Sequence, residues 1–423
     1  MSTTHRTAPL KRLIESAVPG AWGSEPIGEG ADAICIRVAD FVRERFEARE
    51  GDEPTLRFID PQTRERLALV PDDVLLERSG DTGYPARYVG EAGATYSNFL
   101  LRLRPASDVD PRYLWYALQW GYLSGIAASH TNRTTMSNLD VGAYLSARMP
   151  VWPLASQRAI AEYLDRETSR IDALIGARQR MIELLEERWE AFRVASVSGA
   201  TSQSERARSG LRWLGSVPND WSVERLKFLA RMESGHTPDK KVEAYWVDCT
   251  IPWITLNDVG LLEHEWTITQ PINAINELGM ANSAAHILPE GTIVLSRDAT
   301  VGRSAILGRP MTVSQHFVGW IPGPRLMPEY LLHVLRGPMQ RHFATLTAGA
   351  TIATIGMPKL NDLVVPVPPI DDQKRIIAEL RLAENRFNRA RRALDTQVGL
   401  LQERRQSLIT AAVTGQFDIP EAA

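Results

Sequence analysis

Residues 150–160 read PVWPLASQRAI, and residues 366–376 read PVPPIDDQKRI. The second stretch lies 216 positions after the first, and the likeness continues without a gap to LLEER at residues 184–188 and LLQER at residues 400–404. This spacing is far longer than the roughly 20 to 50 residues of a solenoid repeat, so it indicates a duplicated unit of one globular domain and one long helix. The chain is therefore predicted to consist of two similar halves.

Apolar residues recur at heptad spacing in both copies, as they do where one helix packs along another. The predicted seam residues are Ile160, Leu164, Ile171, Leu174, Met181, Leu185 and Phe192 in the first copy and Ile376, Leu380, Phe387, Leu394, Leu401 and Leu408 in the second. A helix of about 40 residues is on the order of 60 Å long, so it must project from a compact domain or span beyond it. Because the chain has two matched seams, we predict that the helices pack on each other in an antiparallel coiled coil. The alternative is that each helix packs only on its own globular domain.

Residues typical of helix termini bound both copies. Pro153 and Pro369 suit a helix start, where a missing N–H group costs little. Gly199 and Gly415 suit a helix end.

Composition places the chain among ordinary globular proteins. It has 423 residues, of which 44% are hydrophobic and 23% charged, enough for two or three cores. Only Cys35 and Cys249 are present, which favours a reducing, cytoplasmic setting. Residues 1–30 have no apolar signal segment, and no run approaches the ~18 apolar residues of a membrane span, so neither secretion nor a membrane partner is expected.

The charge balance permits a nucleic-acid partner without requiring one. The formal net charge is −3, and 42 of the 48 basic residues are arginines. Arginine binds phosphate and guanine bidentately, so this bias is compatible with DNA contact. A genome-wide codon bias explains it equally well.

The segments outside the helices resemble each other more weakly but in the same order. Residues 70–76 parallel residues 288–295 as a turn entering a short strand, and residues 111–118 parallel residues 328–335 as a short amphipathic helix. We therefore predict a mixed α/β (α+β) fold with two similar globular domains, related by a pseudo-twofold arrangement. The predicted segments are domain 1 at 1–149, helix 1 at 150–200, a linker and lead-in at 201–218, domain 2 at 219–365, helix 2 at 366–416 and a tail at 417–423.

Catalytic and cofactor motifs are missing from the sequence. No lysine follows a glycine, which excludes the phosphate-binding loop of ATP-driven motors, and His264-Glu265 is not followed by the second histidine of a zinc site. There is no Asn/Asp-Pro-Pro-Tyr/Phe run of amino-methyltransferases, and Pro71-Asp72-Asp73 lacks the lysine of a nuclease site. We therefore expect no catalytic residues, metal or cofactor in this chain, and a binding function.

Three motifs carry a family resemblance. Each globular segment is followed by a Pro-x-x-Pro-[Leu/Ile]-x-x-Gln-x-x-Ile helix start, Trp213–Lys227 form a lead-in to the second domain, and Ser234–Pro238 form a Gly-x-Thr-Pro turn. With these motifs the chain resembles the specificity subunit of type I restriction-modification systems over nearly its whole length. The first domain departs most, because Trp22-Gly23 and Gly28 give only a weak version of the opening turn.

The resemblance implies two target recognition domains that each read one half of a split sequence in double-stranded DNA, held apart by the coiled coil. It also implies two methyltransferase subunits docked on the coil and domains, followed by restriction translocase-nuclease subunits. S-adenosylmethionine, ATP and Mg²⁺ would then belong to those partners.

Polar residues that interrupt strand-like runs are the candidate DNA contacts, since phosphate contacts position a protein and base contacts specify sequence. In the first domain they are Arg78, Ser97, Asn98, Asn132, Arg133 and Thr134; in the second they are His236, Thr237, Arg297, Thr300, Arg303, Gln315 and His316. The alternative for each residue is a turn-forming or capping role.

Two rival functions remain open. One is a self-contained nuclease or methyltransferase, which the missing motifs disfavour. The other is a protein scaffold that joins two partners through its coil without DNA, which the near-neutral charge permits. A specificity component of a methylation-only or type IIB-like system is a variant of the main interpretation.

Overall fold

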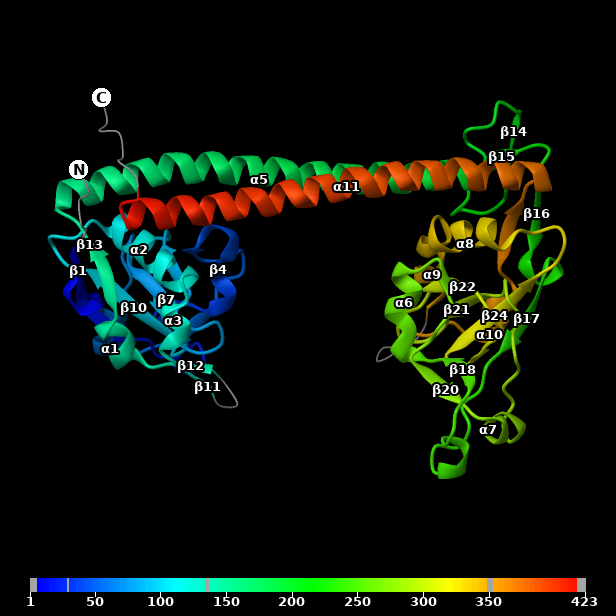
Figure 1. Cartoon of the computed structure of the whole chain (residues 1–423), viewed down its shortest axis with the longest axis horizontal. Coiled ribbons are helices and arrows are strands. Elements are labelled where there is room, and N and C mark those ends of the chain that lie inside the picture. Colours follow the sequence, from blue (N-terminus) through cyan, green and yellow to red (C-terminus); the bar gives the residue numbers. More distant parts are fainter. Residues whose placement is uncertain (1–5, 29, 134–136, 348–352, 417–423) are drawn as a thin grey trace. The chain divides into compact units, whose positions relative to one another are not determined.

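A computed structural model describes residues 6–28, 30–133, 137–347 and 353–416 (Figure 1). The chain divides into two compact units, one of Met1–Arg180 with Leu394–Ala423 and the other of Met181–Ala393. Each unit thus contains one globular domain and one end of each long helix. None of the helices in the described ranges combines the length and apolar character that a membrane span needs.

The domain of the first unit is built on a six-stranded sheet in the order β2-β10-β7-β8-β5-β4. These strands are β2 (Ile14–Pro19), β10 (Leu100–Pro105), β7 (Val74–Glu77), β8 (Pro85–Tyr88), β5 (Glu47–Ala48) and β4 (Phe41–Val42). A smaller sheet has the order β6-β3-β9, with β6 (Leu56–Phe58), β3 (Asp32–Ile36) and β9 (Thr95–Tyr96). Two-stranded sheets join β1 (Arg6–Pro9) to β13 (Arg148–Val151) and β11 (Thr131–Arg133) to β12 (Ser137–Leu139). The helices are α1 (Pro61–Leu67), α2 (Pro111–Leu123), α3 (Ile126–Ser129) and α4 (Val141–Ser146).

The domain of the second unit repeats this topology. Its larger sheet runs β17-β24-β21-β22-β19, with β17 (Ala230–Ser234), β24 (Phe317–Pro322), β21 (Ile293–Ser296), β22 (Ser304–Leu307) and β19 (Thr267–Ile268). Its smaller sheet runs β20-β18-β23, with β20 (Asn273–Ile275), β18 (Ile251–Ile254) and β23 (Thr312–Val313), and β16 (Ser222–Arg225) pairs with β25 (Val364–Val367). A further hairpin joins β14 (Arg206–Arg208) to β15 (Ser216–Pro218). The helices are α6 (Val259–His264), α7 (Glu277–Ala281), α8 (Pro328–Arg336), α9 (Met339–Leu346) and α10 (Met357–Asn361). The two similar mixed α/β domains predicted from the duplication are therefore confirmed.

The glutamine of the repeated motif fastens the start of each long helix to its domain. Helices α5 (Leu154–Val197) and α11 (Ile370–Val413) begin directly after Pro153 and Pro369. Gln157 accepts a hydrogen bond from the Asp110 backbone N–H at 2.9 Å, and Gln373 accepts one from Met327 N–H at 2.8 Å. Both glutamines are almost fully buried, and both accept from the residue that precedes the first helical proline of α2 or α8.

Both long helices end as the glycines predicted. Gly199 and Gly415 each have φ +68°, the left-handed conformation that ends a helix most easily with glycine. Arg206 of β14 donates to the Gly199 carbonyl oxygen at 2.5 Å, which satisfies one of the acceptors left free at the α5 terminus.

The two helices run antiparallel within each unit. In the first unit Asp172 of α5 pairs with Arg405 of α11 at 3.0 Å, and Arg178 bonds Gln397 at 2.7 Å. In the second unit Glu186 pairs with Arg391 at 2.9 Å, and the Trp189 ring stacks on Phe387 with centroids 5.7 Å apart. In every case a higher number on α5 meets a lower number on α11, as an antiparallel pair requires.

One half of the predicted α5 seam is displaced by one residue. Leu174 and Met181 are 43% and 48% exposed, while the neighbouring Ile175 is 9% exposed and Ile182 is half-buried. One series of buried or half-buried positions follows alternate spacings of three and four: Ala161, Leu164, Thr168, Ile171, Ile175, Arg178, Ile182, Leu185, Trp189, Phe192 and Ser196. The sequence offers apolar pairs at 174–175 and 181–182, and a shift of one residue rotates a side chain by about 100° around the helix.

The equivalent positions of α11 are also the less exposed ones. The corresponding buried or half-buried series is Ile377, Leu380, Glu384, Phe387, Leu394, Val398, Leu401, Arg405, Leu408 and Ala412, with Arg391 as an exposed member of the same series. The predicted Ile160 and Ile376 are buried as well, but against the domains, since they belong to the two domain cores.

The helices also pack on the globular domains. The core of the first unit includes Leu164 from the start of α5 and Ile409 from the end of α11, and the core of the second includes Leu380 and Val197. Pairing between helices and packing on domains are therefore combined, although the sequence suggested them as alternatives.

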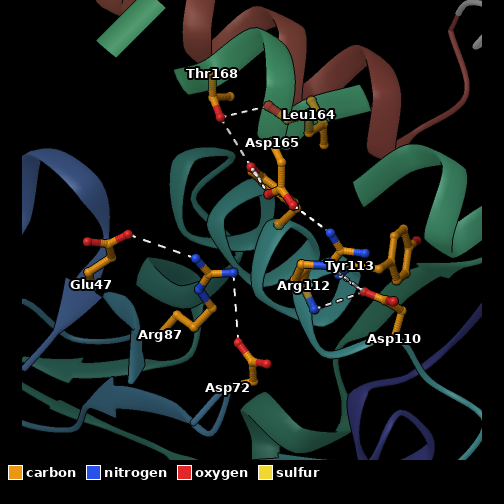
Figure 2. A network of polar contacts seen from close by, with 10 residues as sticks. Glu47, Asp72, Arg87, Asp110, Arg112, Tyr113, Leu164, Asp165 and Thr168 are labelled. Carbon is orange, nitrogen blue, oxygen red and sulfur yellow. Dashed lines mark hydrogen bonds and ion pairs between the residues drawn. The ribbon is translucent and has the colours of Figure 1, made fainter. Parts of the chain in front are cut away.

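A polar network links α5 to α2 in the first unit (Figure 2). Asp165 of α5 pairs with Arg112 at 2.8 Å and accepts a hydrogen bond from the Tyr116 hydroxyl at 2.9 Å. Tyr116 also lies 3.1 Å from the Thr168 hydroxyl. The network holds the domain against α5 about three to four turns after the start of the helix.

Candidate nucleic-acid interface

A hairpin loop is pinned in the same way in both domains. In the second, the N–H of Arg297 donates to the His316 carbonyl at 2.9 Å, and Ile355 N–H donates to the Arg297 carbonyl at 2.9 Å. In the first, Arg78 N–H donates to Phe99 at 2.7 Å, and Leu139 N–H donates to Arg78 at 2.8 Å. Arg78 and Arg297, both predicted from the sequence, therefore occupy equivalent positions.

Ser97 and Ser314 are a second equivalent pair. Their N–H groups donate to the carbonyls of Ile36 and Ile254, each at 2.9 Å, and both side chains are at most 2% exposed. These serines are thus part of the framework of the site, and their neighbours Asn98 and Gln315 are exposed.

A glycine lies against the backbone next to each of these serines. A Cβ on Gly235 would lie 2.0 Å from the Val313 carbonyl oxygen, and one on Gly20 would lie 2.4 Å from the Tyr96 carbonyl oxygen. The counterpart of Gly235 in the first domain is therefore Gly20, which corrects the weak alignment of Trp22-Gly23 with the opening turn. Trp22 is then the counterpart of Thr237.

The second domain contains a pocket of about 460 Å³ beside this turn. Its wall consists of Thr237, Lys240, Trp246, Trp253, Thr255, Leu256, Asn257, Asn273, Ser314, Gln315 and His316. These residues come from the loop after β17, from β18 and the turn after it, from β20 and from the loop before β24. Strands β18 and β20 lie at the end of the domain away from the α11 segment of this unit (Figure 1).

Three of the predicted residues meet at this pocket and form a hydrogen-bonded chain. The Thr237 hydroxyl donates to the Gln315 amide oxygen, and the Gln315 amide nitrogen lies 3.3 Å from His316 Nε2. His316 Nδ1 lies 2.9 Å from Asp298 Oδ2. With Asp298 as the acceptor, His316 carries its proton on Nδ1 and accepts from Gln315, so the amide of Gln315 is held in one orientation.

The remaining candidates of the second domain lie outside the pocket wall. His236 and Thr300 are exposed, and Arg297 is half-buried with its side chain donating to the Ile355 carbonyl at 3.3 Å. Arg303 is ion-paired with Glu263 of α6. The structure therefore does not bring Arg303 to the site, because α6 supplies a carboxylate partner that sequence reasoning did not anticipate.

In the first domain the candidates are less concentrated. Arg78 is half-buried and donates to the Asn98 carbonyl at 3.4 Å, and Asn132 is exposed on β11. The side chain of Arg133 and the whole of Thr134 lie outside the described residues. Sequence reasoning missed Trp22 and Phe99, which are 38% and 43% exposed at the equivalent turns.

It also missed Lys240, Trp253 and Asn273 of the second domain. The signal for Trp253 was an aromatic residue in the short strand Ile251–Ile254 that leads directly into the polar Thr255. Within the described ranges, His, Cys, Asp and Glu side chains do not gather in any group of three or more that could hold a metal ion. The absence of a metal and a cofactor remains a prediction.

The comparison with known proteins agrees with this arrangement. Residues 218–393 match the type I restriction modification DNA specificity domain. At 21% identity the chain is similar to the type I restriction enzyme MjaVIII specificity subunit of Methanocaldococcus jannaschii, over 84% of this chain and 82% of that protein. The EcoBI specificity subunit of Escherichia coli, also at 21%, is matched over 89% of this chain and 82% of its own length.

The matched residues thus carry the type I restriction modification DNA specificity domain, and most of the chain is similar to type I restriction enzyme specificity subunits. Sequence recognition on DNA is the function of this family. A higher identity of 30%, with the MjaIX specificity subunit of M. jannaschii, extends over 40% of this chain and only 38% of that relative.

Solved structures of specificity subunits share the fold. One, from work on complex assembly and conformational transition of the type I restriction-modification system, superposes with a TM-score of 0.74 at 15% identity, over 99% of both chains. The HsdS subunit from Thermoanaerobacter tengcongensis gives 0.53 at 15% identity, over 99% of this chain and 98% of that one. These likenesses confirm the predicted fold, and the domain match and the relatives confirm the resemblance inferred from the repeated motif.

Proposed function

We propose that this chain is the non-catalytic DNA-reading subunit of a type I restriction-modification complex, in which each globular domain reads one half of a bipartite target. The observation that carries the proposal is the exposed Gln315, held in one orientation at the rim of the second-domain pocket, together with the equivalent turn at Asn98 in the first domain. An oriented amide is the kind of group that discriminates base edges in a groove. The pocket and the turn at Asn98 each belong to a domain whose core includes residues of both long helices.

The paired helices set the distance between the two half-sites in this proposal. They also provide the docking surface for two methyltransferase subunits, and restriction translocase-nuclease subunits join afterwards. S-adenosylmethionine, ATP and Mg²⁺ are bound by those partners, and this chain contributes position and sequence selection. The missing catalytic motifs support this division of labour.

Lengthening both helices by one heptad tests the spacing role. Insertions after Arg180 and after Ala393 keep each helix in heptad phase and add about 10 Å, which corresponds to roughly three base pairs of rise. Methylation sequencing of cells that express the variant with its methyltransferase is expected to show the same two half-sites with a longer gap. An insertion in α5 alone is the control, since it misaligns the pair and is expected to abolish methylation. An unchanged gap in the doubly lengthened variant contradicts the proposal.

A further inference from the structure

The pocket of the second domain has an unusual charge composition for this chain. Among the residues that the structure describes, Lys240 and His316 are the only ionisable ones on its wall, and no aspartate or glutamate lines it. The chain as a whole has more acidic than basic residues, 51 against 48. A wall without carboxylates favours an anionic ligand.

Three carboxylates that contact wall residues or adjoin them in the chain already have hydrogen-bond partners. Asp258 accepts hydrogen bonds from the N–H of Thr255 at 2.8 Å and of Ile272 at 2.6 Å. Asp298 accepts from His316. Asp239, next to Lys240 in the chain, accepts from the Lys241 backbone N–H. These contacts orient wall residues, and the described wall combines Lys240 with neutral side chains and His316.

Two buried donors of the wall lack a hydrogen-bond partner among the described residues. Trp253 and Ser314 are 5% and 2% exposed, and the indole Nε1 and the serine hydroxyl are both unpaired. An indole N–H can only donate, so it requires an acceptor. The equivalent Ser97 of the first domain is buried with an unpaired hydroxyl as well. The duplicated fold has therefore kept an unpaired buried donor at the same position twice.

The aromatic geometry argues against a nucleobase as the ligand. The rings of Trp246 and Trp253 lie 5.4 Å apart at an interplanar angle of 48°. A base that is held by stacking needs a parallel face, and these two rings contact each other in a tilted pair instead.

We infer that this pocket binds a phosphate of the DNA backbone and positions the second domain on the duplex without reading sequence. The inference rests on the proposed function and assigns the pocket to backbone contact. Lys240 supplies the charge, and Trp253 and Ser314 supply buried donors to the phosphate oxygens. Base reading is then left to exposed residues around the rim.

Lys240→Gln tests the assignment, with Lys241→Gln as the matched control, because Lys241 is the adjacent exposed lysine and does not line the pocket. The full chain in complex with its methyltransferase is titrated, over a range of salt concentrations, with a duplex that carries the methylated motif and with one in which a half-site is altered. Loss of one phosphate contact reduces the magnitude of the negative slope of log K against log salt by about 0.9. The ratio of wild-type to variant affinity is therefore about 8-fold larger at 0.1 M salt than at 1 M salt. The weakening is expected to be equal for both duplexes, and Lys241→Gln is expected to retain the wild-type slope.

Trp253→Phe provides a second variant without a change of charge, and it is expected to weaken binding to both duplexes by the same factor while the salt slope stays unchanged. Replacing single phosphates of the duplex by neutral methylphosphonates then locates the contact. Replacement at one position is expected to weaken DNA binding by the wild-type complex but not by the Lys240→Gln complex. An unchanged slope in Lys240→Gln, or a change in preference between the two duplexes, overturns the inference. A wild-type complex that does not distinguish the duplexes refutes the proposed function instead.

Discussion

Gly235→Ala is expected to damage the second-domain site directly. An alanine Cβ would lie 2.0 Å from the Val313 carbonyl oxygen and 2.5 Å from that of Ser314, where real Cβ atoms essentially never approach below 3.0 Å. Both neighbours are backbone atoms, one at the end of β23 and one directly after it, so neither can move aside as a flexible side chain could. The turn after β17 must retreat by at least 1.0 Å, the difference between 3.0 and 2.0 Å.

That retreat breaks a specific hydrogen bond. His236 N–H donates to the Val313 carbonyl at 3.1 Å, and a further ångström takes this distance beyond bonding range. Losing one such bond costs about 1 kcal/mol, and inserting a methyl group into a packed site costs about 1–3 kcal/mol. The unfolding free energy of the second unit is therefore expected to fall by about 2–4 kcal/mol. Thr237 and Gln315 are expected to lose their contact.

The matched control is Gly260→Ala in α6 of the same domain, where an added Cβ meets no atom within 4 Å. This change is expected to stabilise the helix by up to about 1 kcal/mol. Urea unfolding followed by tryptophan fluorescence measures both variants, and titration with half-site duplexes measures the site. If Gly235→Ala unfolds at the wild-type urea concentration and discriminates duplexes equally well, the close approach in the structure is incorrect.

Two further changes test the core and the helix pair. His333 of α8 is 4% exposed, and burial, aided by the positive charges of Arg193 and Arg336, lowers its pKa to about 3. In the unfolded chain this histidine takes up a proton near pH 6.5, whereas in the folded chain it stays neutral down to about pH 3. The unfolding free energy therefore falls as the pH drops from about 6.5 towards 3, by roughly 2 kcal/mol at pH 5. His333→Phe is expected to flatten this part of a plot of unfolding free energy against pH. Ile175→Asp is expected to destabilise the first unit by about 3 kcal/mol or more because it buries a charge. Leu174→Asp, at an exposed position, is expected to change the urea midpoint of unfolding little. Equal effects of the two variants would contradict the different burial of the two residues.

The repeat spacing and the helix termini were the parts of the fold that sequence reasoning could predict. Because the repeat is displaced by a constant 216 positions, the two halves are expected to share one topology. The larger sheets of the two domains do share a strand order, β2-β10-β7-β8-β5 in the first and β17-β24-β21-β22-β19 in the second. Gly199 and Gly415 marked the helix ends because a positive φ is a local requirement, independent of the rest of the fold.

The phase of the α5 seam could not be predicted in the same way. Leu174 and Ile175 are both apolar, and either one continues a heptad series from Ile171. The choice depends on the rotation of the helix about its axis, which is set by contacts with the globular domain as well as with α11. Those contacts are long-range and leave no local pattern.

The pocket was predictable only in part for a similar reason. Thr237 and Gln315 stood out as polar residues within strand-like runs, but Asn273 and Trp253 enter the same wall from another sheet. Arg303 looked equivalent to the other candidates, and its ion pair with Glu263 depends on how α6 folds over the hairpin. Local sequence indicates which residues are unusual, and tertiary packing determines which of them meet.

The duplication itself separates the framework of the site from its variable part. At three equivalent positions the two domains carry the same residue type: Gly20 and Gly235, Arg78 and Arg297, and Ser97 and Ser314. At nearby positions that are exposed or half-buried they differ, with Asn98 where the second domain has Gln315, Phe99 where it has His316, and Trp22 where it has Thr237. If both faces contact DNA as proposed, the shared residues serve what every duplex has in common, and the differing ones face what distinguishes one half-site from the other. The two half-sites should then differ in sequence, because the two faces present different donors, acceptors and aromatic surfaces from the same backbone positions.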